Sequence, residues 1–188
     1  MVTIYLVRHG EADYGPIRDR RWPGAVSDLA PLTARGSQQA RTAACQLSAA
    51  GATGIVSSPM TRALQSAALM ACDLGLLVKV DFELREWLPD DTFSWRSYAD
   101  VVAAADDFKR CGGEWPAGQR RAWEPLSQVR ERATVALTRH LSPMNDDQVL
   151  IAVCHEMVIR ALTGQCHTST GAFRRISFSE GRLRTSDP

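Results

Sequence analysis

The chain has 188 residues, of which 45% are apolar and 23% are charged, and its formal net charge is +1. This length suits one compact domain over residues 1–188, and so small a net charge gives no global field that would attract nucleic acid or a membrane surface. Any affinity for an anion must therefore be local.

The cysteines and the apolar segments indicate which compartment the chain suits. Its five cysteines are scattered without a CxxC pair, which argues against a disulfide framework or a structural zinc site. No basic segment precedes an apolar core at the N-terminus, and no apolar run is long enough to cross a bilayer. We therefore expect a cytoplasmic protein with reduced thiols, no signal peptide and no membrane or nucleic-acid partner.

The apolar stretch at residues 2–7 predicts a strand that is buried on both faces at the centre of a parallel sheet. It runs directly into Arg8 and His9. Ligands bind beyond the carboxyl ends of the strands in open α/β sheets, so we expect these two side chains at the mouth of a site. Gly10 then lets the backbone turn sharply and approach a ligand closely.

The next segment, residues 11–31, contains several glycines and prolines and little periodicity, which predicts a long irregular loop over the carboxyl edge of the sheet. Thr33 can cap a helix over residues 34–50, and Gly51 can stop it. A short buried strand is predicted over residues 54–57.

A second strand-to-helix turn follows that strand. The sequence predicts a helix that begins at Ser58 or Pro59 and continues to about residue 74. Arg62 would then lie in the first turn of this helix, again at the carboxyl edge of the sheet.

The middle of the chain differs in character from the rest. Residues 76–80 predict a third strand, which Glu83 and Glu86 follow. The region at about residues 87–123 holds four of the five tryptophans and mixes acidic pairs with arginines. We interpret it as an inserted lid, whose aromatic residues either pack a small satellite core or line a pocket.

The last third of the chain returns to regular patterns. A core-facing helix is predicted over residues 125–141, and a fourth buried strand over residues 148–154 runs directly into His155. The final predicted element is a closing hairpin, made of residues 172–178, the turn Glu180-Gly181 and residues 182–185.

Three strand-to-helix turns thus bring reactive side chains to one edge of the sheet, namely Arg8, His9, Arg62 and His155, with Glu86 after a further strand. Guanidinium groups donate in rigid forks that suit phosphate oxygens, and a helix N-terminus adds backbone donors. A neutral histidine can attack phosphorus to give a covalent phosphohistidine, and a carboxyl group opposite can protonate the departing alkoxide and then activate water. The residues therefore predict a phosphate site with two-step chemistry.

Each of these residues also has a plainer interpretation. A histidine after a strand is more often a hydrogen-bonded structural residue, and Arg62 could form only a surface ion pair worth about 1 kcal/mol or less. Composition alone does not show whether Glu83 or Glu86 would supply the carboxyl group that donates the proton. His140 and His167 lack a comparable context, and we expect both to be structural.

Four blocks of sequence carry these residues in order: LVRHGE at residues 6–11, LTARG with the following QA at 32–40, SSPMTRALQSA at 57–67, and VCHEMVIR at 153–160. Together they resemble the signature of the histidine phosphatase superfamily, the phosphoglycerate mutase-like group with an RHG motif. The resemblance spans nearly the whole chain and leaves only the middle segment unanchored. It implies a three-layer α/β/α fold with a mostly parallel central sheet.

The resemblance also implies the composition of the phosphate site. It identifies His9 as the nucleophile and Arg8, Arg62 and His155 as the rest of the phosphate pocket, with Gly10 beside the substrate.

The proton donor implied by the resemblance is Glu86, because residues 84–86 are similar to the family's LxE stretch after the third strand. Glu83 is the fallback. The family needs no metal and no other cofactor for this chemistry, and we expect none here.

Three residues depart from the pattern of the family. Gly15 stands where many members carry an asparagine six residues after the nucleophile, and Cys154, which we expect to be buried, replaces a serine. Glu156 replaces the glycine that commonly follows the second histidine. Its carboxylate would repel a phosphate dianion unless it is paired or points away, and it could also hold His155 protonated.

Hydrolysis and mutase-type transfer share their first half-reaction and differ in whether water or a sugar acid receives the phosphoryl group. Mutases of the family resemble one another in a longer chain with a tail that shields the phosphohistidine, so the short end of this chain favours water. We therefore expect a metal-independent phosphomonoester hydrolase of the histidine acid phosphatase type, acting on a small phosphorylated substrate.

Other activities stay open at this point. They are phosphoglycerate mutase-type transfer, a catalytically weak member that binds a phosphorylated ligand, and a phosphohistidine-protein phosphatase, although the last group tends to lack a middle segment. The sequence gives no indication of the oligomeric state.

Overall fold

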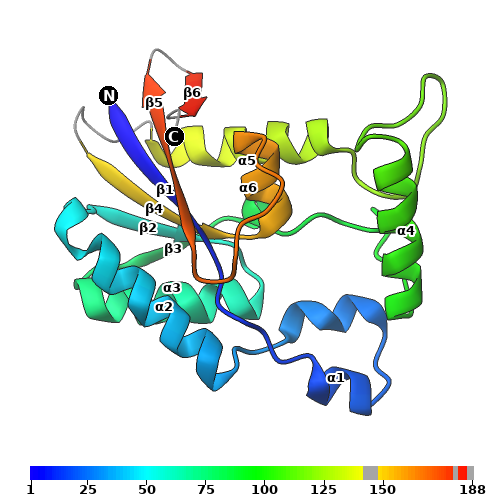
Figure 1. Ribbon diagram of the computed structural model, residues 1–188, viewed down its shortest axis with the longest axis horizontal. Helices are drawn as coiled ribbons and strands as arrows, with labels where there is room; N and C mark the ends of the chain where they lie inside the picture. Colours follow the sequence, from blue (N-terminus) through cyan, green and yellow to red (C-terminus); the bar gives the residue numbers. More distant parts are fainter. Residues whose placement is uncertain (142–147, 180–181, 186–188) are drawn as a thin grey trace.

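The computed structural model describes residues 1–141, 148–179 and 182–185, and its centre is a six-stranded sheet in the order β3-β2-β4-β1-β5-β6 (Figure 1). Four strands are parallel to one another: β1 (Val2–Arg8), β2 (Gly54–Ser57), β3 (Val78–Val80) and β4 (Val149–Cys154). β5 (Phe173–Ser179) runs antiparallel to β1 and to β6 (Arg182–Thr185). The prediction of a mostly parallel sheet is confirmed, and the turn predicted at Glu180-Gly181 lies outside the described residues.

Helices cover both faces of this sheet, which confirms the three predicted layers. α2 (Ala34–Leu47) and α3 (Thr61–Leu74) pack on one face, and α5 (Leu126–Leu141) and α6 (Glu156–Thr163) pack on the other (Figure 1). A buried apolar cluster fills each of the two spaces between layers. No helix among the described residues has the length and apolar character that spanning a bilayer would require.

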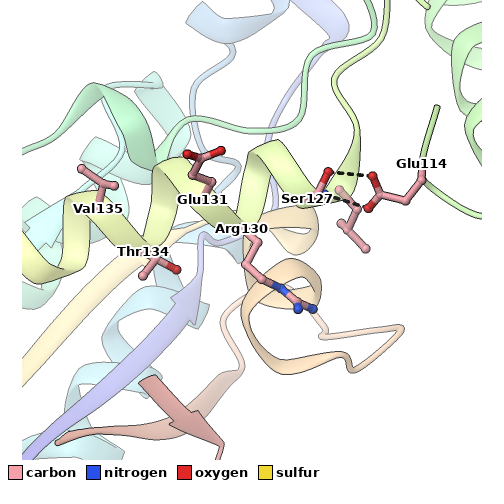
Figure 2. Close-up of a pocket in the computed structure, with 7 residues that line it drawn as sticks. Glu114, Ser127, Arg130, Glu131, Thr134 and Val135 are labelled. Atoms are coloured by element: carbon pink, nitrogen blue, oxygen red, sulfur yellow. Dashed lines mark hydrogen bonds between the residues drawn. The ribbon is translucent and has the colours of Figure 1, made fainter. Parts of the chain in front are cut away.

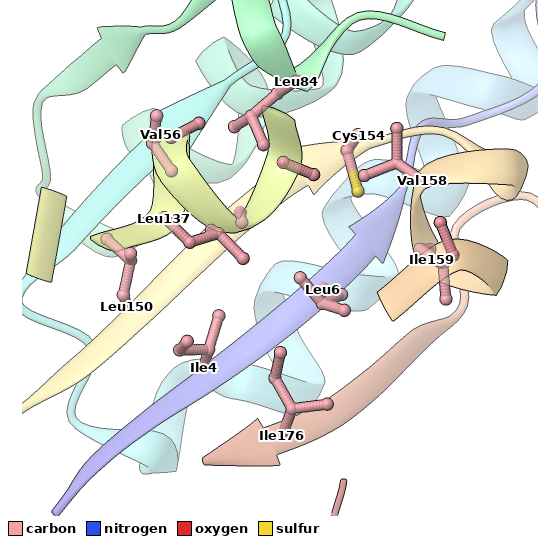
Figure 3. Close-up of a cluster of buried hydrophobic side chains, with 14 of the residues drawn as sticks. Ile4, Leu6, Val56, Leu84, Leu137, Leu150, Cys154, Val158, Ile159 and Ile176 are labelled. Carbon is pink, nitrogen blue, oxygen red and sulfur yellow. The ribbon is translucent and has the colours of Figure 1, made fainter. Parts of the chain in front are cut away.

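The side chains of β1 pack into both clusters. Ile4 and Leu6 join the cluster beneath α5 and α6 (Figure 3), whereas Val7 joins the cluster beneath α2 and α3, with Tyr5 packed against it. Successive strand residues point to opposite faces, so an almost continuous apolar run is what a central strand needs. Because both faces of β1 are covered, its polar continuation emerges at the carboxyl edge of the sheet.

The start of α2 lies against the turn that follows β1. The Thr33 hydroxyl accepts a hydrogen bond from the Gly36 N–H at 2.8 Å, which confirms the predicted cap. A methyl group on Gly36 would lie 2.1 Å from the carbonyl oxygen of Glu11, and one on Gly10 would lie 2.1 Å from the carbonyl oxygen of Gly36. Contact between these two backbones therefore requires glycine at Gly10 and Gly36.

The two helices on this face end at glycines. α2 stops at Leu47, and a 3-10 turn, η2 (Ser48–Ala50), leads to Gly51, whose φ of 68° is left-handed. α3 likewise ends at Gly75, with a φ of 68°. Glycine adopts this conformation without the steric cost that a side chain would add.

The prediction of an irregular loop over residues 11–31 is wrong in part. The segment contains a short helix, α1 (Gly15–Asp19), and a 3-10 helix, η1 (Gly24–Leu29). Each is too short to show a repeating apolar stripe, and only Ile17 of α1 is buried. Periodicity therefore could not reveal them.

Residues 87–123 contain one regular element, α4 (Tyr98–Arg110), which begins with a capping box between Ser97 and Asp100. Aromatic rings pack on this helix. The ring of Phe108 lies edge-on to Trp87 at 5.4 Å and to Trp123 at 5.3 Å between centroids. Phe108 and Trp123 are buried outside the two main clusters, whereas Trp87 also packs against the cluster beneath α5 and α6.

Candidate active site

The carboxyl ends of β1 and β4 bring two histidines together. Arg8 pairs with Cys154 across the sheet, and the His9 N–H donates to the Cys154 carbonyl at 3.1 Å. The rings of His9 and His155 consequently lie 5.0 Å apart, with an angle of 61° between their planes. Two strand ends that are far apart in sequence thus meet as predicted.

Hydrogen bonds determine which nitrogen of His9 carries the proton. Nδ1 lies 2.7 Å from the carbonyl oxygen of Gly10, which can only accept, so Nδ1 holds the proton and donates it. Arg62 Nε donates to Nε2 at 3.2 Å, so Nε2 presents its lone pair. Burial, aided by the charges of Arg62 and Arg8 and opposed by the Gly10 carbonyl, lowers the pKa of His9 to about 3.

Arg62 lies in the first turn of α3 and is only 5% exposed, so it is not a surface residue. Besides His9, its guanidinium donates to the Ser27 carbonyl at 3.4 Å and lies 3.9 Å from the Asp28 carboxylate. η1 therefore covers this arginine. Burial raises the pKa of Asp28, and the Arg62 charge opposes that shift.

His155 is completely buried beside His9. Its Nε2 lies 2.8 Å from the Ser58 hydroxyl, whereas its Nδ1 has no partner among the described residues. Burial, followed by the charges of Arg62 and His9, holds the pKa of His155 well below its ordinary value. The expectation that Glu156 could keep His155 protonated is therefore wrong.

Glu156 pairs with Arg8 instead. Its Oε2 lies 2.8 Å from Arg8 Nη1, and its Oε1 lies 2.6 Å from Nδ1 of His167. Arg8 Nη1 also donates to the Thr168 carbonyl at 2.6 Å, but Arg8 Nε is buried without a partner in the described part of the chain. The carboxylate that replaces the family's glycine is thus paired.

Glu86 is half-buried and lies in the segment that follows β3. The Trp87 N–H donates to Glu86 Oε1 at 2.8 Å. Burial raises the pKa of Glu86, against opposing effects of this hydrogen bond and of Arg62 and Arg8. Burial raises the pKa of the Cys154 thiol at the end of β4, and the Glu86 charge adds to that shift.

Glu83, the fallback for the proton donor, points elsewhere. Its carboxylate pairs with Arg85 at 2.6 Å, and its side chain is 34% exposed. Glu86 instead accepts the Trp87 N–H, and burial raises its pKa. The geometry favours Glu86.

Several contacting residues had no role in the sequence prediction. The Ser66 hydroxyl accepts from the Gly10 N–H at 3.0 Å and donates to the Arg62 carbonyl at 2.8 Å, and Gln39 Oε1 accepts from the Glu11 N–H at 2.8 Å. Ser58 binds His155 as described above. All three lie inside the four sequence blocks that resemble the family, so the polar residues next to the charged ones in those blocks could have indicated them.

A surface groove of about 430 Å³ lies along α5, away from these residues (Figure 2). Its lining consists of Glu114, Leu126, Ser127, Arg130, Glu131, Thr134 and Val135. No predicted site residue lines it. Among the described residues, no group of three or more His, Cys, Asp or Glu side chains is placed to hold a metal ion.

A family model described as the histidine phosphatase superfamily (branch 1) matches residues 4–185. The chain belongs to this superfamily. The membership predicted from the four blocks is confirmed.

Curated relatives of this histidine phosphatase superfamily member include bacterial proteins named as mutases. The probable phosphoglycerate mutase GpmB of Salmonella typhi is 41% identical over 126 residues, which are 61% of this chain and 56% of that protein. GpmB of Escherichia coli O1:K1 is 41% identical over 143 residues, 73% of this chain and 62% of that protein. The chain thus spans less than two thirds of the length of these relatives.

Solved structures with the same fold include proteins named as phosphatases. A mycobacterial glucosyl-3-phosphoglycerate phosphatase has a TM-score of 0.75 at 22% identity, with 98% of this chain and 97% of that chain covered. Bacillus stearothermophilus YhfR has a TM-score of 0.77 at 21% identity, with 99% and 96% covered. At these identities the likeness shows the fold alone.

Gly15 of this superfamily member, which stands where many members carry an asparagine, is the first residue of α1. The Gly15 N–H donates to the Asp13 carboxylate at 2.9 Å as α1 begins. Cys154 is fully buried, as expected. Of the predicted site residues, the structure brings His9, Arg62 and His155 into direct or ring contact, with Arg8 and Glu86 bordering them.

Proposed function

We propose that the chain hydrolyses small phosphomonoesters through a phosphohistidine on His9, without a metal ion. The proposal rests on the Nε2 atom of His9, which is unprotonated and lies 3.2 Å from the Arg62 guanidinium at the carboxyl edge of the sheet. A pKa of about 3 keeps this nitrogen neutral, and therefore nucleophilic, at any pH near 7.

Phosphate binding would satisfy groups that lack partners. Arg8 Nε and His155 Nδ1 are buried nitrogens without hydrogen bonds in the described residues. The cost of leaving such groups unsatisfied favours a ligand with several acceptor oxygens. The phosphoryl oxygens take hydrogen bonds from Arg8, Arg62 and His155, and Arg62 releases the lone pair of Nε2 as it turns to the ligand.

In the first step Nε2 attacks phosphorus, a P–N bond forms and the P–O bond to the alcohol breaks. Glu86, whose raised pKa favours the protonated form, gives its proton to the leaving oxygen. His9 becomes a phosphohistidine, still held at Nδ1 by the Gly10 carbonyl.

In the second step the Glu86 carboxylate takes a proton from water, and the water oxygen attacks phosphorus. The P–N bond breaks, which returns neutral His9, protonated Glu86 and inorganic phosphate. The same carboxyl group thus serves as acid and then as base, as microscopic reversibility requires.

Trapping the intermediate tests this proposal. The wild type and a His9→Ala variant are incubated with an aryl phosphate, and release of the phenol and acid-labile phosphate on the protein are measured. We expect both signals in the wild type and neither in the variant. If the wild type shows neither turnover nor label, the chain binds phosphorylated ligands without transferring the phosphoryl group.

Mutase-type transfer is the second candidate, and the names of the curated relatives favour it. A bisphosphorylated sugar acid would then prime phosphoryl exchange without net release of phosphate. One observation opposes this candidate. Three arginines of the middle segment that could bind a substrate carboxylate are already paired with aspartates of the same segment: Arg120–Asp91 at 2.6 Å, Arg121–Asp107 at 3.4 Å and Arg110–Asp107 at 2.5 Å. The ratio of exchange to phosphate release decides between the two activities.

We also propose that residues 1–188 act as one domain and that residues 87–123 are an insert bordering the leaving-group side of the site. A methyl group on Gly24 would lie 2.1 Å from Cδ1 of Trp95, so this insert rests directly on η1. η1 in turn supplies the Ser27 carbonyl that binds Arg62. A Trp95→Leu variant should therefore change KM across a panel of phosphomonoesters more than it changes the amount of phosphohistidine formed.

A further inference from the structure

Arg132, a buried residue of α5, holds the backbone on either side of Glu86. Its Nε and Nη2 donate to the two carboxylate oxygens of Glu124 at 2.6 and 3.0 Å. Its Nη1 donates to the carbonyl oxygens of Glu83 at 2.5 Å and Arg85 at 2.8 Å, and its Nη2 also donates to the Glu86 carbonyl at 3.2 Å. These bonds use all five N–H donors of an arginine.

Beyond Glu83, the stretch that Arg132 holds has no secondary structure of its own. The 3-10 helix η3 (Phe82–Leu84) ends just before it, and Leu84 anchors that helix in the cluster beneath α5 (Figure 3). Residues 85–88 belong to no helix or strand, so no backbone ladder orients them. The hydrogen bonds from Arg132 take the place of such a ladder around Glu86.

Glu124 is bound to the same stretch. Its N–H donates to the Leu88 carbonyl at 3.0 Å, and its carbonyl accepts from the Trp87 indole N–H at 2.6 Å. The Arg132–Glu124 pair is almost completely buried, with side chains 9% and 6% exposed. A buried ion pair adds little net stability, because the desolvation of both charges offsets their attraction.

We propose that Arg132, held in place by Glu124, is a positioning residue that fixes the backbone around Glu86 and so directs its proton to the leaving group. This inference rests on the proposed role of Glu86 as the proton donor. Among the described residues, the hydrogen bonds of Arg132 go to Glu124 and to the backbone around Glu86, not to the His9 ring, so its effect falls on proton delivery rather than on nucleophilic attack.

Leaving-group dependence separates these two effects. Dinitrophenolate departs without a proton, whereas an alkoxide must receive one. An Arg132→Lys variant keeps the charge but cannot make the five hydrogen bonds. We expect its kcat/KM to fall roughly 30-fold or more for butyl phosphate and by less than about threefold for 2,4-dinitrophenyl phosphate. kcat/KM is the parameter to compare, because it reports the steps up to cleavage of the P–O bond.

Arg130→Lys is the matched control on the same helix. Arg130 Nε also donates to a backbone carbonyl, that of Ala161 at 2.6 Å, but it does not contact the stretch that carries Glu86. We expect this variant to keep the wild-type ratio of the two kcat/KM values. Glu86→Gln serves as the reference, because it removes the acid itself and should show the largest change in that ratio.

The outcomes are distinct. A selective loss in Arg132→Lys that resembles Glu86→Gln supports the positioning role, whereas an equal loss on both esters, or none, overturns it. If Glu86→Gln keeps the wild-type ratio, Glu86 is not the proton donor, and the positioning role falls with it while His9 labelling is untouched. If Arg132→Lys does not fold, the same ratio is measured in Glu124→Gln, where a wild-type ratio overturns the proposal.

Discussion

Acid should destabilise the fold through His9, because the buried ring stays neutral at pH values where a free histidine takes up a proton. The pKa of His9 falls from 6.5 to about 3 in the fold. Between these values the unfolded chain binds a proton that the folded chain does not, so the free energy of unfolding falls as the pH falls, and this loss ends near pH 3. One pKa unit is worth 1.36 kcal/mol, so His9 alone should cost about 3 kcal/mol between pH 7 and pH 4.

Urea unfolding, followed by far-ultraviolet circular dichroism at pH 7 and pH 4, measures this loss. A His9→Asn variant lacks the titrating ring but keeps an N–H donor for the Gly10 carbonyl. We expect the wild type to lose about 3 kcal/mol more than this variant on acidification. A Ser66→Ala variant disturbs the same turn but retains His9, so its loss should equal that of the wild type. Equal losses in the wild type and His9→Asn would mean that burial does not hold the His9 ring neutral.

Three further predictions concern the site and its support. First, kcat/KM should fall as the pH rises through the raised pKa of Glu86, and a Glu86→Gln variant should lack this alkaline fall. A pH profile of kcat/KM for both proteins on one ester tests this, because the ionisation of the ester affects both proteins equally. Second, Glu156→Gln should free Arg8 and tighten inhibition by inorganic phosphate by a factor of about five, corresponding to about 1 kcal/mol for a partly exposed pair; an unchanged or weaker inhibition constant would contradict this. Third, Gly36→Ala should lower the free energy of unfolding by about 2 kcal/mol or more in urea titrations, although alanine favours helices. Gly54→Ala is the control and should change the free energy of unfolding little, because its methyl group would meet only a Leu150 carbon at 3.7 Å.

Much of the fold was predictable because the decisive signals are local. The apolar segments of β1, β2 and β4 must be buried in the core, and the polar residues that follow them must lie at the carboxyl edge of the sheet. Once the strands are parallel, their carboxyl ends meet, and this brings His9 and His155 together without further information. The convergence of these side chains was therefore predictable from strand ends and motif order.

Contacts made at a distance in the chain were not predictable. Arg132 looks like one more charge on a helix, and only the fold shows that it faces carbonyl groups more than 40 residues away. The pairing of Glu156 with Arg8 and His167 is of the same kind, since His167 carries no motif. Side-chain hydrogen bonds between distant segments produce no repeating pattern of residues, so the sequence alone does not reveal them.

The aromatic core of the middle segment determines what optical probes can report. Four of the five tryptophans, Trp87, Trp95, Trp115 and Trp123, lie in residues 87–123, and the fifth, Trp22, lies near η1. Intrinsic fluorescence therefore observes this segment and its neighbour, whereas circular dichroism observes the helices and the sheet. Unfolding curves that coincide by both methods would show one cooperative unit, and a fluorescence transition at lower urea would show that the tryptophan-rich segment melts while the sheet and its histidines stay in place.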